Sequence, residues 1–475
     1  MKLRILCFGI ALQGLAGCAV GPDFQAPRMA TPGHFSVTGA ALTEQAPPDA
    51  WWRAFHDARL DALVQDALAH NPDVAAAAAH IRQARAERDA LSGSDLPQVE
   101  ASARESRDNL SLNSEGFSNI PTAVVPHPQH EFNDYRIGLD ASWEIDLFGY
   151  NRRSVEAATA RLDSAAERAH AAVLEVAAEV ALDYIDLRAA QQRAALAVQN
   201  AELARDQLRL TRLARRAGLA SDLDIERDES ALRAAEARIP LFEAQVRADM
   251  NALTLLLGQA PGTLDARLAA PGEVPAVPPV VGVGLPSDLL QRRPDVRGAL
   301  QDLAAANADV GVAVAAQYPR FSLVSSLGYD SIHPGQLTSQ ASRFWGFGPQ
   351  VSLPLFSGFQ LQNQVKANQA AYDAALQGYR KAVLNALSDS ETALIRFDRE
   401  TSRLTQLDAA RQSAGRSLDL TRKRVAVGEV GETDALQADV AVLQATDQWT
   451  QSQAARAADL VGLFKALGGG WRAVP

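Results

Sequence analysis

The sequence predicts an α+β protein made of two copies of one structural repeat, in which very long helices are joined to short amphipathic strands. The stretch from Pro72 to Pro97 has the same pattern as the stretch from Pro294 to Pro319, at an offset of 222 residues. Residues that alternate between apolar and polar follow each copy. Helical patterns of roughly 65 residues come next, and each would extend about 100 Å. Helices of that length need neighbours along which to pack.

The composition favours helix packing and argues against a nucleic-acid-binding protein. Hydrophobic residues make up 47% of the 475 residues, much of this alanine, and only 6% are aromatic. The formal net charge is -10 and the basic residues form no block. Phosphate recognition needs clustered Lys and Arg, so no nucleic-acid partner is expected.

The N-terminus reads as an export signal and not as part of the fold. Residues 1–17 place Lys2 and Arg4 before a short apolar run that ends in small residues. Leu15-Ala16-Gly17-Cys18 is similar to a bacterial lipobox, which implies a lipidated, palmitate-carrying Cys18 at the start of the mature chain. Cys7 would be removed with the signal, which leaves no pair of thiols for a disulfide.

The first repeat is expected at residues 71–258. A proline at the first helical turn with an aspartate beside it suits a helix start, and a later proline ends that helix. The expected elements are a helix at about 72–94, strands near 97–107 and 134–148, a long helix from Gly149 to about Arg215 and a returning helix at about 222–257. The strand near 97–107 alternates poorly and rests on the symmetry of the repeats.

The second repeat is expected at residues 294–468. Its long helix, turn and returning helix match those of the first repeat at an offset of 210. The offset is smaller than 222 because the hairpin loop is longer in the first copy, at 108–131, than in the second, at 331–342. The expected elements are a helix at about 294–316, strands at 320–330 and 344–356, a long helix from Gly358 to about Arg424 and a returning helix at about 432–467.

Three segments lie outside the repeats. Residues 18–70 are expected to be extended and then to form a short amphipathic helix, and residues 259–293 read as a Pro- and Gly-rich linker. Residues 469–475 are a C-terminal tail. Trp51 and Trp52 are expected to pack against other parts of the chain, with ligand stacking as the alternative.

The strands have one apolar and one polar side. On 134–148, Ile137, Leu139 and Trp143 share a side, and Leu323, Leu327 and Tyr329 do so on 320–330. Four such strands cannot close a barrel, and an open edge is not tolerated in lipid, so other chains must complete it. The aromatics Trp143, Trp345 and Phe347 would suit membrane interfaces. The alternative is a soluble sheet.

Several motifs carry a resemblance to one family. The segments are "GCAVGPDFQAP", "LPSDLLQRRPDVRGAL" with the following "YPRFSL", the "WW" region before "NPD", and the closing "LFKALGGGW". Together they resemble the outer-membrane factors, the TolC-like channels of tripartite efflux systems, and specifically their OprM-like and NodT-type lipoprotein branch. The resemblance covers nearly the whole mature chain, and "RRPDVR" is its most specific part.

The resemblance implies a fold, a location and partners. It implies a homotrimer in which a twelve-stranded transmembrane β-barrel, four strands from each chain, continues into a long periplasmic α-helical barrel. The chain would lie in the outer membrane, held by lipid and extending into the periplasm. Its partners would be a periplasmic adaptor, also called a membrane fusion protein, and an inner-membrane pump of the kind that confers multidrug resistance.

The repeated turns are the best candidate sites, because the resemblance places them at the periplasmic tip. It implies adaptor contacts at four turn residues: Gly218, Ser221, Gly428 and Gly431. It implies a periplasmic gate at four charged residues: Asp224, Asp434, Arg422 and Arg424. Helix capping is the alternative for the aspartates, although they lie beyond the cap residue, and interaction with the helix dipole is the alternative for the arginines. Gln437 stands where the TolC pattern has a second gate aspartate, so a double acidic ring is not implied.

No catalytic or metal site is expected. The sequence contains no GxSxG, Walker or HExxH motif. His127 and His130 are expected to be ordinary loop residues, because two histidines without a third ligand are a poor metal site. No cofactor is expected apart from the lipid on Cys18. The expected function is a passive exit duct for small molecules. The alternatives are a type I protein-secretion channel and a periplasmic structural or adaptor coiled-coil lipoprotein.

Overall fold

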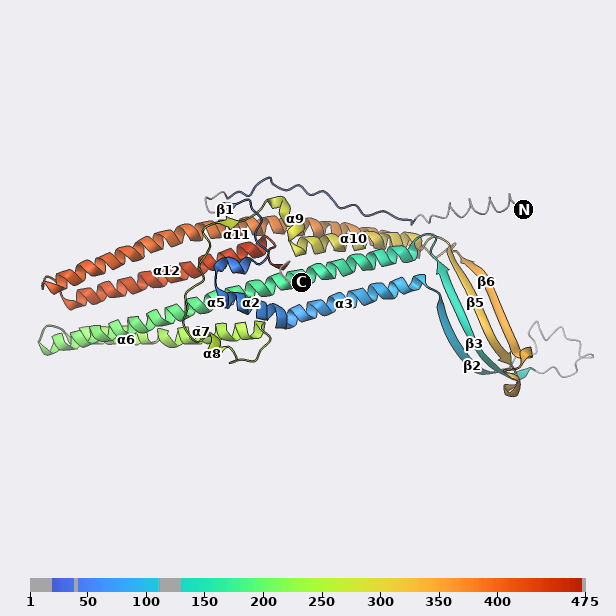
Figure 1. The fold of residues 1–475 in the computed structure, drawn as a ribbon, viewed down its shortest axis with the longest axis horizontal. Helices are drawn as coiled ribbons and strands as arrows, with labels where there is room; N and C mark the ends of the chain where they lie inside the picture. Colours follow the sequence, from blue (N-terminus) through green and yellow to red (C-terminus); the bar gives the residue numbers. More distant parts are fainter. Residues whose placement is uncertain (1–18, 38–41, 110, 112–129, 472–475) are drawn as a thin grey trace, which may run out of the picture. The chain divides into compact units, whose positions relative to one another are not determined.

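The computed structural model describes residues 19–37, 42–109, 111 and 130–471 (Figure 1). The chain divides into two compact units. Unit 1 contains 82–163 and 301–377 together with the N-terminal residues up to Ala26. Unit 2 contains the rest of the chain. The signal segment 1–17, Cys18 and His127 lie outside the described residues, as do most of the loop 108–131 and residues 472–475 of the tail.

The long helices lie where the sequence predicted them. Helices α5 and α11 are each 67 residues long, and α3 and α10 begin at the two prolines that the sequence singled out. The longer helices are α2 (Ala58–His70), α3 (Pro72–Ser92), α5 (Tyr150–Arg216), α6 (Asp222–Glu236), α7 (Arg238–Leu256), α10 (Pro294–Ala315), α11 (Gln360–Ala426) and α12 (Glu432–Ala466).

The returning helix of the first repeat differs from the prediction. The sequence predicted one helix at about 222–257, but α6 ends at Glu236 and α7 begins at Arg238. Pro240 lies in the first turn of α7, where the missing N–H of proline is tolerated, although in a continuous helix it would remove the hydrogen bond to residue 236. The equivalent position of the second repeat is Thr450, and α12 continues through it.

The strands of unit 1 form one antiparallel sheet in the order β2-β3-β5-β6. The strands are β2 (Gln98–Asn109), β3 (Glu131–Ile145), β5 (Arg320–Ser331) and β6 (Arg343–Ser352). They lie side by side in Figure 1. In the register, Leu139 pairs with Ala101 on one side and with Leu327 on the other. The strand near 97–107, predicted from symmetry alone, is thus confirmed.

The two repeats also agree in the contacts that end their returning helices. The Asn71 side chain donates to the Leu256 carbonyl at 2.9 Å, and Arg293 donates to the equivalent carbonyl of Ala466 at 3.2 Å. The following glycines both have positive φ, 65° at Gly258 and 71° at Gly468. Each repeat therefore ties the end of its returning helix to the start of its first helix.

The core of unit 2 contains the tryptophans of the N-terminal segment. Trp51 is fully buried, and its ring stacks on Phe464 of α12 with centroids 5.6 Å apart. Trp52, which is 2% exposed, meets Trp51 edge-on. Both residues lie in a short 3-10 helix, Trp51–Phe55. The prediction that they pack against other parts of the chain is confirmed.

Residues 259–293 are more ordered than the predicted linker. They contain α8 (Asp265–Leu268), β4 (Val281–Gly282), the 3-10 helix Pro286–Asp288 and α9 (Leu289–Arg292), and β4 pairs in parallel with β1 (Leu42–Thr43). The fully buried Arg188 donates to the Ala270 carbonyl at 2.9 Å, and Gln191 donates to the Leu268 carbonyl at 2.8 Å. Side chains of α5 thus bind the backbone of this segment, whose sequence has no helical or strand periodicity.

In unit 1 the first described residues are bound to the junction between β3 and α5. The Val20 N–H donates to the Phe148 carbonyl at 3.0 Å. Arg153, which is 4% exposed, pairs with Asp23 at 2.7 Å. Asn307 of α10 donates to the Pro22 carbonyl at 2.9 Å. The segment that follows Cys18 is therefore held against two helices.

The close approach at Gly468 gives a stability prediction. A Cβ there would lie 2.8 Å from the Arg292 carbonyl oxygen, and φ is positive, so Gly468→Ala should lower the free energy of unfolding by about 1–3 kcal/mol. Gly415→Ala, inside α11 with open space around it, is the control and should leave stability unchanged or raise it by up to about 1 kcal/mol. Denaturant unfolding of the solubilised protein measures both, and equal effects would contradict the assigned clash.

Candidate functional site: an amphipathic sheet and two hairpin turns

The sheet has one face of exposed apolar side chains. All four strands contribute to it, and the register places these residues on the same side. The exposed apolar residues on this face are Val99, Ile137, Leu139, Trp143, Ile145, Leu327, Trp345, Phe347 and Val351. Exposing a continuous apolar surface to water is unfavourable, at about 25 cal/mol per Å². The face therefore needs an apolar environment from outside the chain.

The opposite face of the sheet is polar. Ser102 donates to Asp140 across the β2–β3 pair at 3.3 Å, and the Arg136 guanidinium lies 4.3 Å from the centre of the Phe344 ring. Phe344 pairs with Gly328, where a Cβ would collide with the Ile137 carbonyl. Alternation between an apolar and a polar face is typical of strands that separate lipid from water.

Strands β2 and β6 are the outer strands of the sheet. The sequence predicted a strand at 344–356, but β6 ends at Ser352. The strand ends before the apolar pattern does because Pro354 has no N–H to donate to a neighbouring strand. Leu355 and Phe356, just beyond, are 89% and 82% exposed. Trp143, near the end of β3, donates to the Asp95 carbonyl at 2.9 Å. Backbone and apolar groups are thus both exposed at the edges.

The turn of the first repeat is a double cap. Gly218 has φ 77°, and the next N–H, of Leu219, donates to the Ala214 carbonyl at 2.8 Å, as expected for a glycine that ends a helix. Ser221 then begins α6, and its N–H and hydroxyl donate to Asp224 Oδ2 at 2.9 and 2.7 Å. These bonds from Ser221 hold the pKa of the Asp224 carboxyl below its usual value.

The turn of the second repeat has the same geometry. Gly428 has φ 73°, and the Glu429 N–H donates to the Arg424 carbonyl at 2.9 Å. The Gly431 N–H donates to Asp434 Oδ2 at 2.9 Å. The sequence placed Asp224 and Asp434 beyond the caps, but both carboxylates are cap partners. Capping and a gate role are compatible, because a capping carboxylate keeps its charge.

The predicted gate arginines have partners within the chain. Arg422 of α11 contacts both carboxylate oxygens of Asp439 on α12 at 2.9 Å. The first repeat has the equivalent pair, Arg212 with Glu229, at 3.3 Å. Arg424 pairs with Glu429 at 3.1 Å. The recurrence of the first pair indicates that Arg422 joins the two helices of its own hairpin.

Within the described residues, no group of three or more His, Cys, Asp or Glu is arranged to hold a metal ion. His127 lies outside those residues and His130 at their edge. Among the described helices, none is long and apolar enough to cross a bilayer.

Sequence reasoning missed an acidic group on α5 and α7 in unit 2. Asp183 and Asp186 on α5 lie near Asp249 on α7. Burial raises the pKa of the Asp249 carboxyl and that of Asp183, the latter to about 6; partial desolvation also raises the pKa of Asp186, although its side chain is the most exposed of the three. Alignment of the repeats at an offset of 210 could have pointed to this acidic group. It places Asp186 of the first repeat opposite Arg396 of the second, which is a reversal of charge.

Comparisons with known proteins agree on one family. The family profile described as outer membrane efflux protein matches residues 63–259 and 285–469. The pyoverdine export outer membrane protein OpmQ of Pseudomonas aeruginosa is 29% identical, with 99% of this chain and 98% of OpmQ covered. The antibiotic efflux pump outer membrane protein ArpC of Pseudomonas putida is 30% identical, with 99% and 96% covered. The solved outer-membrane channel OprN is 31% identical, with a TM-score of 0.85 over 96% of this chain and 100% of OprN.

The cap at Ser221 gives a prediction about the first turn of α6. Ser221→Ala removes the hydroxyl that accepts from the Asp224 N–H and donates to its carboxylate, so amide exchange at 224 and 225 should become about three- to tenfold faster. Ser221→Thr keeps the hydroxyl and serves as the control. Because the pKa of Asp224 lies below the usual 3.8, the stabilisation is complete above that pH and is lost as the pH falls further. Equal exchange in the three proteins would contradict the cap.

Proposed function

This chain belongs to the outer membrane efflux protein family, and we propose on that premise that it is the passive outer-membrane exit duct of a tripartite efflux system. It expels small molecules, with a periplasmic adaptor and an inner-membrane pump as partners. The pump supplies energy and direction, and the duct carries out no chemistry of its own. The relatives named for pyoverdine export and antibiotic efflux support a small-molecule cargo.

One observation carries this proposal: the four-stranded sheet exposes an apolar face and two outer strands. Lipid can cover the apolar face, but it cannot satisfy the backbone hydrogen-bonding groups of an open edge. The edges must therefore pair with other copies of the chain. Four strands from each of three copies close a twelve-stranded barrel with an even strand number and a polar interior.

The difference in burial between equivalent helices supports the same assembly. Helix α10 packs on the start of α5 within unit 1, where Arg161 pairs with Asp309 at 2.5 Å. The equivalent helix of the first repeat, α3, has no buried residue. Likewise Ala157, Ala158 and Ala160 of α5 are buried, whereas the first buried residue of α11 is Tyr379. A neighbouring copy would cover α3 with its own α11.

The in-chain contact at the strand–helix junction supplies a template for this interface. Phe148 packs against Tyr318 with tilted rings whose centroids are 4.8 Å apart. At the equivalent positions, Phe356 is 82% exposed and Leu96 is 64% exposed. We therefore place Phe356 of one copy against Leu96 of the next, in a head-to-tail contact that closes into a ring.

The N-terminal segment supports a lipid anchor on Cys18. Ala19 lies against Gly149, where an added Cβ would approach it to 2.7 Å, at the junction between β3 and α5. An acyl group on Cys18 would add a second attachment to the outer-membrane lipid that surrounds the proposed barrel. A single acylated residue anchors a protein only marginally, so barrel and lipid act together.

Cysteine cross-linking tests the assembly. In a Cys18→Ser background, Leu96→Cys with Phe356→Cys should give covalent dimers and trimers on oxidation, because the template contact brings these side chains together. Within one chain they flank the outer strands of the sheet, three strand spacings or about 14 Å apart, too far for a disulfide. Purification from detergent-solubilised outer membranes precedes oxidation.

Each single cysteine variant and the pair Leu96→Cys with Val427→Cys, at the hairpin turn, serve as controls that should stay monomeric in denaturing gels. The same samples are recorded in planar bilayers. Discrete channel openings without cross-linking would disprove this interface alone, whereas a soluble monomer without conductance would disprove the duct itself.

The turn carboxylates give a prediction about conductance. Three copies would bring Asp224 and Asp434 into two sets of three charges near one end, which we propose as part of the gate together with Arg422 and Arg424. Adaptor hairpins would contact the four turn residues Gly218, Ser221, Gly428 and Gly431. Asp434→Ala should leave trimerisation intact and raise single-channel conductance.

Asp434→Asn separates the two roles of this residue, because it keeps an oxygen for the Gly431 N–H but removes the charge. A rise in conductance with both substitutions assigns the effect to charge. An unchanged conductance in both folded trimers would remove Asp434 from the gate.

A further inference from the structure

The two repeats place different charges at one equivalent position between their long and returning helices. At an offset of 210, Asp183, Asp186 and Asp249 of the first repeat correspond to Ala393, Arg396 and Asp459 of the second. The formal charge at these three positions is therefore -3 in the first repeat and zero in the second. We call Asp183, Asp186 and Asp249 the acid cluster.

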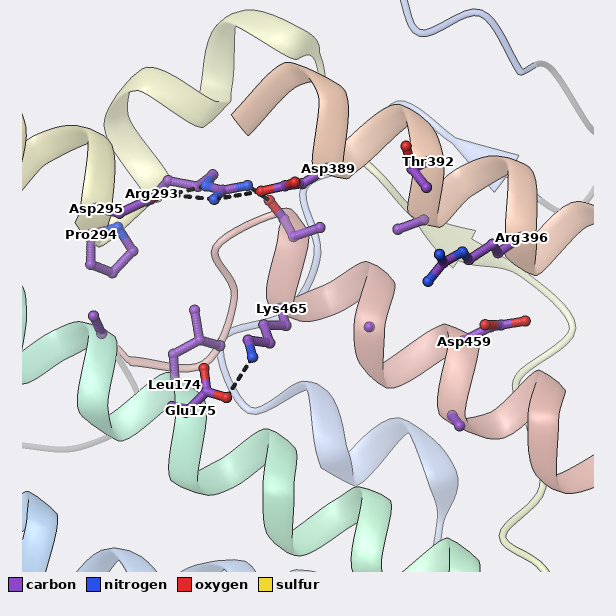
Figure 2. Close-up of a pocket in the computed structure, with 15 residues that line it drawn as sticks. Leu174, Glu175, Arg293, Pro294, Asp295, Asp389, Thr392, Arg396, Asp459 and Lys465 are labelled. Atoms are coloured by element: carbon purple, nitrogen blue, oxygen red, sulfur yellow. Dashed lines mark hydrogen bonds and ion pairs between the residues drawn. The ribbon is translucent and has the colours of Figure 1, made fainter. Parts of the chain in front are cut away.

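In the second repeat this position borders a cavity whose lining carries both signs of charge, three cations and four carboxylates. The cavity has a volume of about 580 Å³ and lies between α5, α11, α12 and the start of α10. Figure 2 shows Arg396 and Asp459 on two different helices beside it. Burial and Glu400 raise the pKa of Asp459, but Arg396 opposes that rise.

The other charged residues around that cavity are paired as well. Lys465 of α12 contacts Glu175 of α5 at 2.6 Å, and Arg293 contacts Asp389 of α11 at 3.1 Å, both marked in Figure 2. A cation thus faces each carboxylate of this group in the second repeat.

Among the described residues of the first repeat, no cation lowers the pKa of any member of the acid cluster. Asp249 is 8% exposed; its Oδ1 accepts from Gln245 at 2.7 Å, and its Oδ2 has no hydrogen-bond partner within the described part of the chain. Burial raises the pKa of Asp183 to about 6, with added repulsion from Asp249, Asp186 and Glu179. An unpaired buried carboxylate oxygen beside other acids is a site that favours a proton.

The charges on the neighbouring helices do not neutralise the cluster. On α5, Glu179 is the next acid along the helix, and burial raises its pKa, with contributions from Glu175 and from Asp73 of α3. Lys465 of α12 lowers the pKa of Glu179. It is not among the groups that shift the pKa of Asp183, Asp186 or Asp249.

The acid cluster also joins the one returning helix that is interrupted. Asp249 lies on α7, which is separated from α6 at Ala237, whereas α12 is continuous at the equivalent position. A helix segment that is not continuous with its predecessor depends more on its lateral contacts for its position.

We propose that protonation of the acid cluster stabilises the packing of α7 on α5 in the first repeat. When the cluster carries a proton, α7 packs stably on α5; when the cluster is fully ionised, this packing is weaker. The second repeat has a weaker dependence, because Arg396 takes the place of one acid and opposes the ionisation cost of Asp459. The two repeats would then respond differently to the pH around the protein.

The direction follows from the protonation states. Between the ordinary Asp pKa of 3.8 and the folded value of about 6 for Asp183, the docked state binds more protons than the undocked state. Docking is therefore strongest below this range and weakens as the pH rises through it. In the proposed duct, acidification would stiffen three of the six helical sectors, a consequence that rests on the proposed function.

Hydrogen exchange on the intact, detergent-solubilised protein tests this proposal without any transport assay. After correction for the intrinsic rate, amides in 238–256 should exchange about five- to tenfold faster at pH 7.5 than at pH 5. This ratio is smaller than the full shift of the Asp183 pKa would give, because the Asp183 side chain is partly exposed. The equivalent amides in 448–466 should change by less than about twofold. Equal pH dependence in the two segments would overturn the proposal.

Two substitutions exchange the charges of the repeats. Asp186→Arg should remove the pH dependence of 238–256, and Arg396→Asp should create one in 448–466. If Asp186→Arg does not fold, Asp186→Asn should still reduce the dependence, because it removes one acid of similar size. The proposal would also be overturned if 238–256 kept its wild-type pH dependence in Asp186→Asn and 448–466 gained none in Arg396→Asp. This outcome does not depend on whether the protein conducts.

Discussion

The exposed apolar face of the four-stranded sheet is the constraint on which the rest of the structure depends. Its side chains come from every strand and share one side because the register pairs Ile137 with Tyr329 and Leu139 with Leu327. Water is a poor environment for such a surface, and lipid is a poor environment for the edges of β2 and β6. A closed barrel of several copies satisfies both requirements. The exposed surfaces of α3 and of the start of α11 belong to the same requirement, because their equivalents in the other repeat are covered within the chain.

The repeats share their framework and differ where they carry charge. Positive-φ glycines end the returning helices in both, and a polar side chain at the start of the first helix binds the last helical carbonyl in both. These contacts are backbone-directed and tolerate different side chains, Asn71 in one repeat and Arg293 in the other. The interruption at Ala237 and the acid cluster occur only in the first repeat. In a trimer the two repeats of each chain would form six similar sectors. The interruption and the acid cluster would occur in every second sector, so these two features would follow threefold symmetry.

The hairpin turns show how one carboxylate can have two roles. Asp224 and Asp434 accept from the N–H at the start of their helices, which accounts for an acid three residues after the cap. Within one chain these bonds stabilise the first turn of each helix. In a closed ring of three copies, however, the same charges would lie near their counterparts, and repulsion or cation binding there would depend on the assembly. Arg422 is paired with Asp439 in its own hairpin, so a gate contact would have to compete with that pair.

The sequence by itself determined the kind and order of the elements. The offsets between prolines, the turn glycines Gly218 and Gly428 and the alternating strands depend on local period and backbone preference, which one chain displays directly. The interruption before α7 was missed, although Pro240 is a local signal, because a proline in the first turn of a helix is tolerated and does not mark a boundary clearly. The ordered segment 259–293 was missed because its structure comes from Arg188 and Gln191, which are distant in sequence.

Only the tertiary structure decided the strand order β2-β3-β5-β6, the cap bonds of the two aspartates and the meeting of Asp183, Asp186 and Asp249. Each of these depends on which faces of distant segments turn toward each other. Periodicity identifies a face of one helix or strand, but the partner of that face is set by packing across the whole fold.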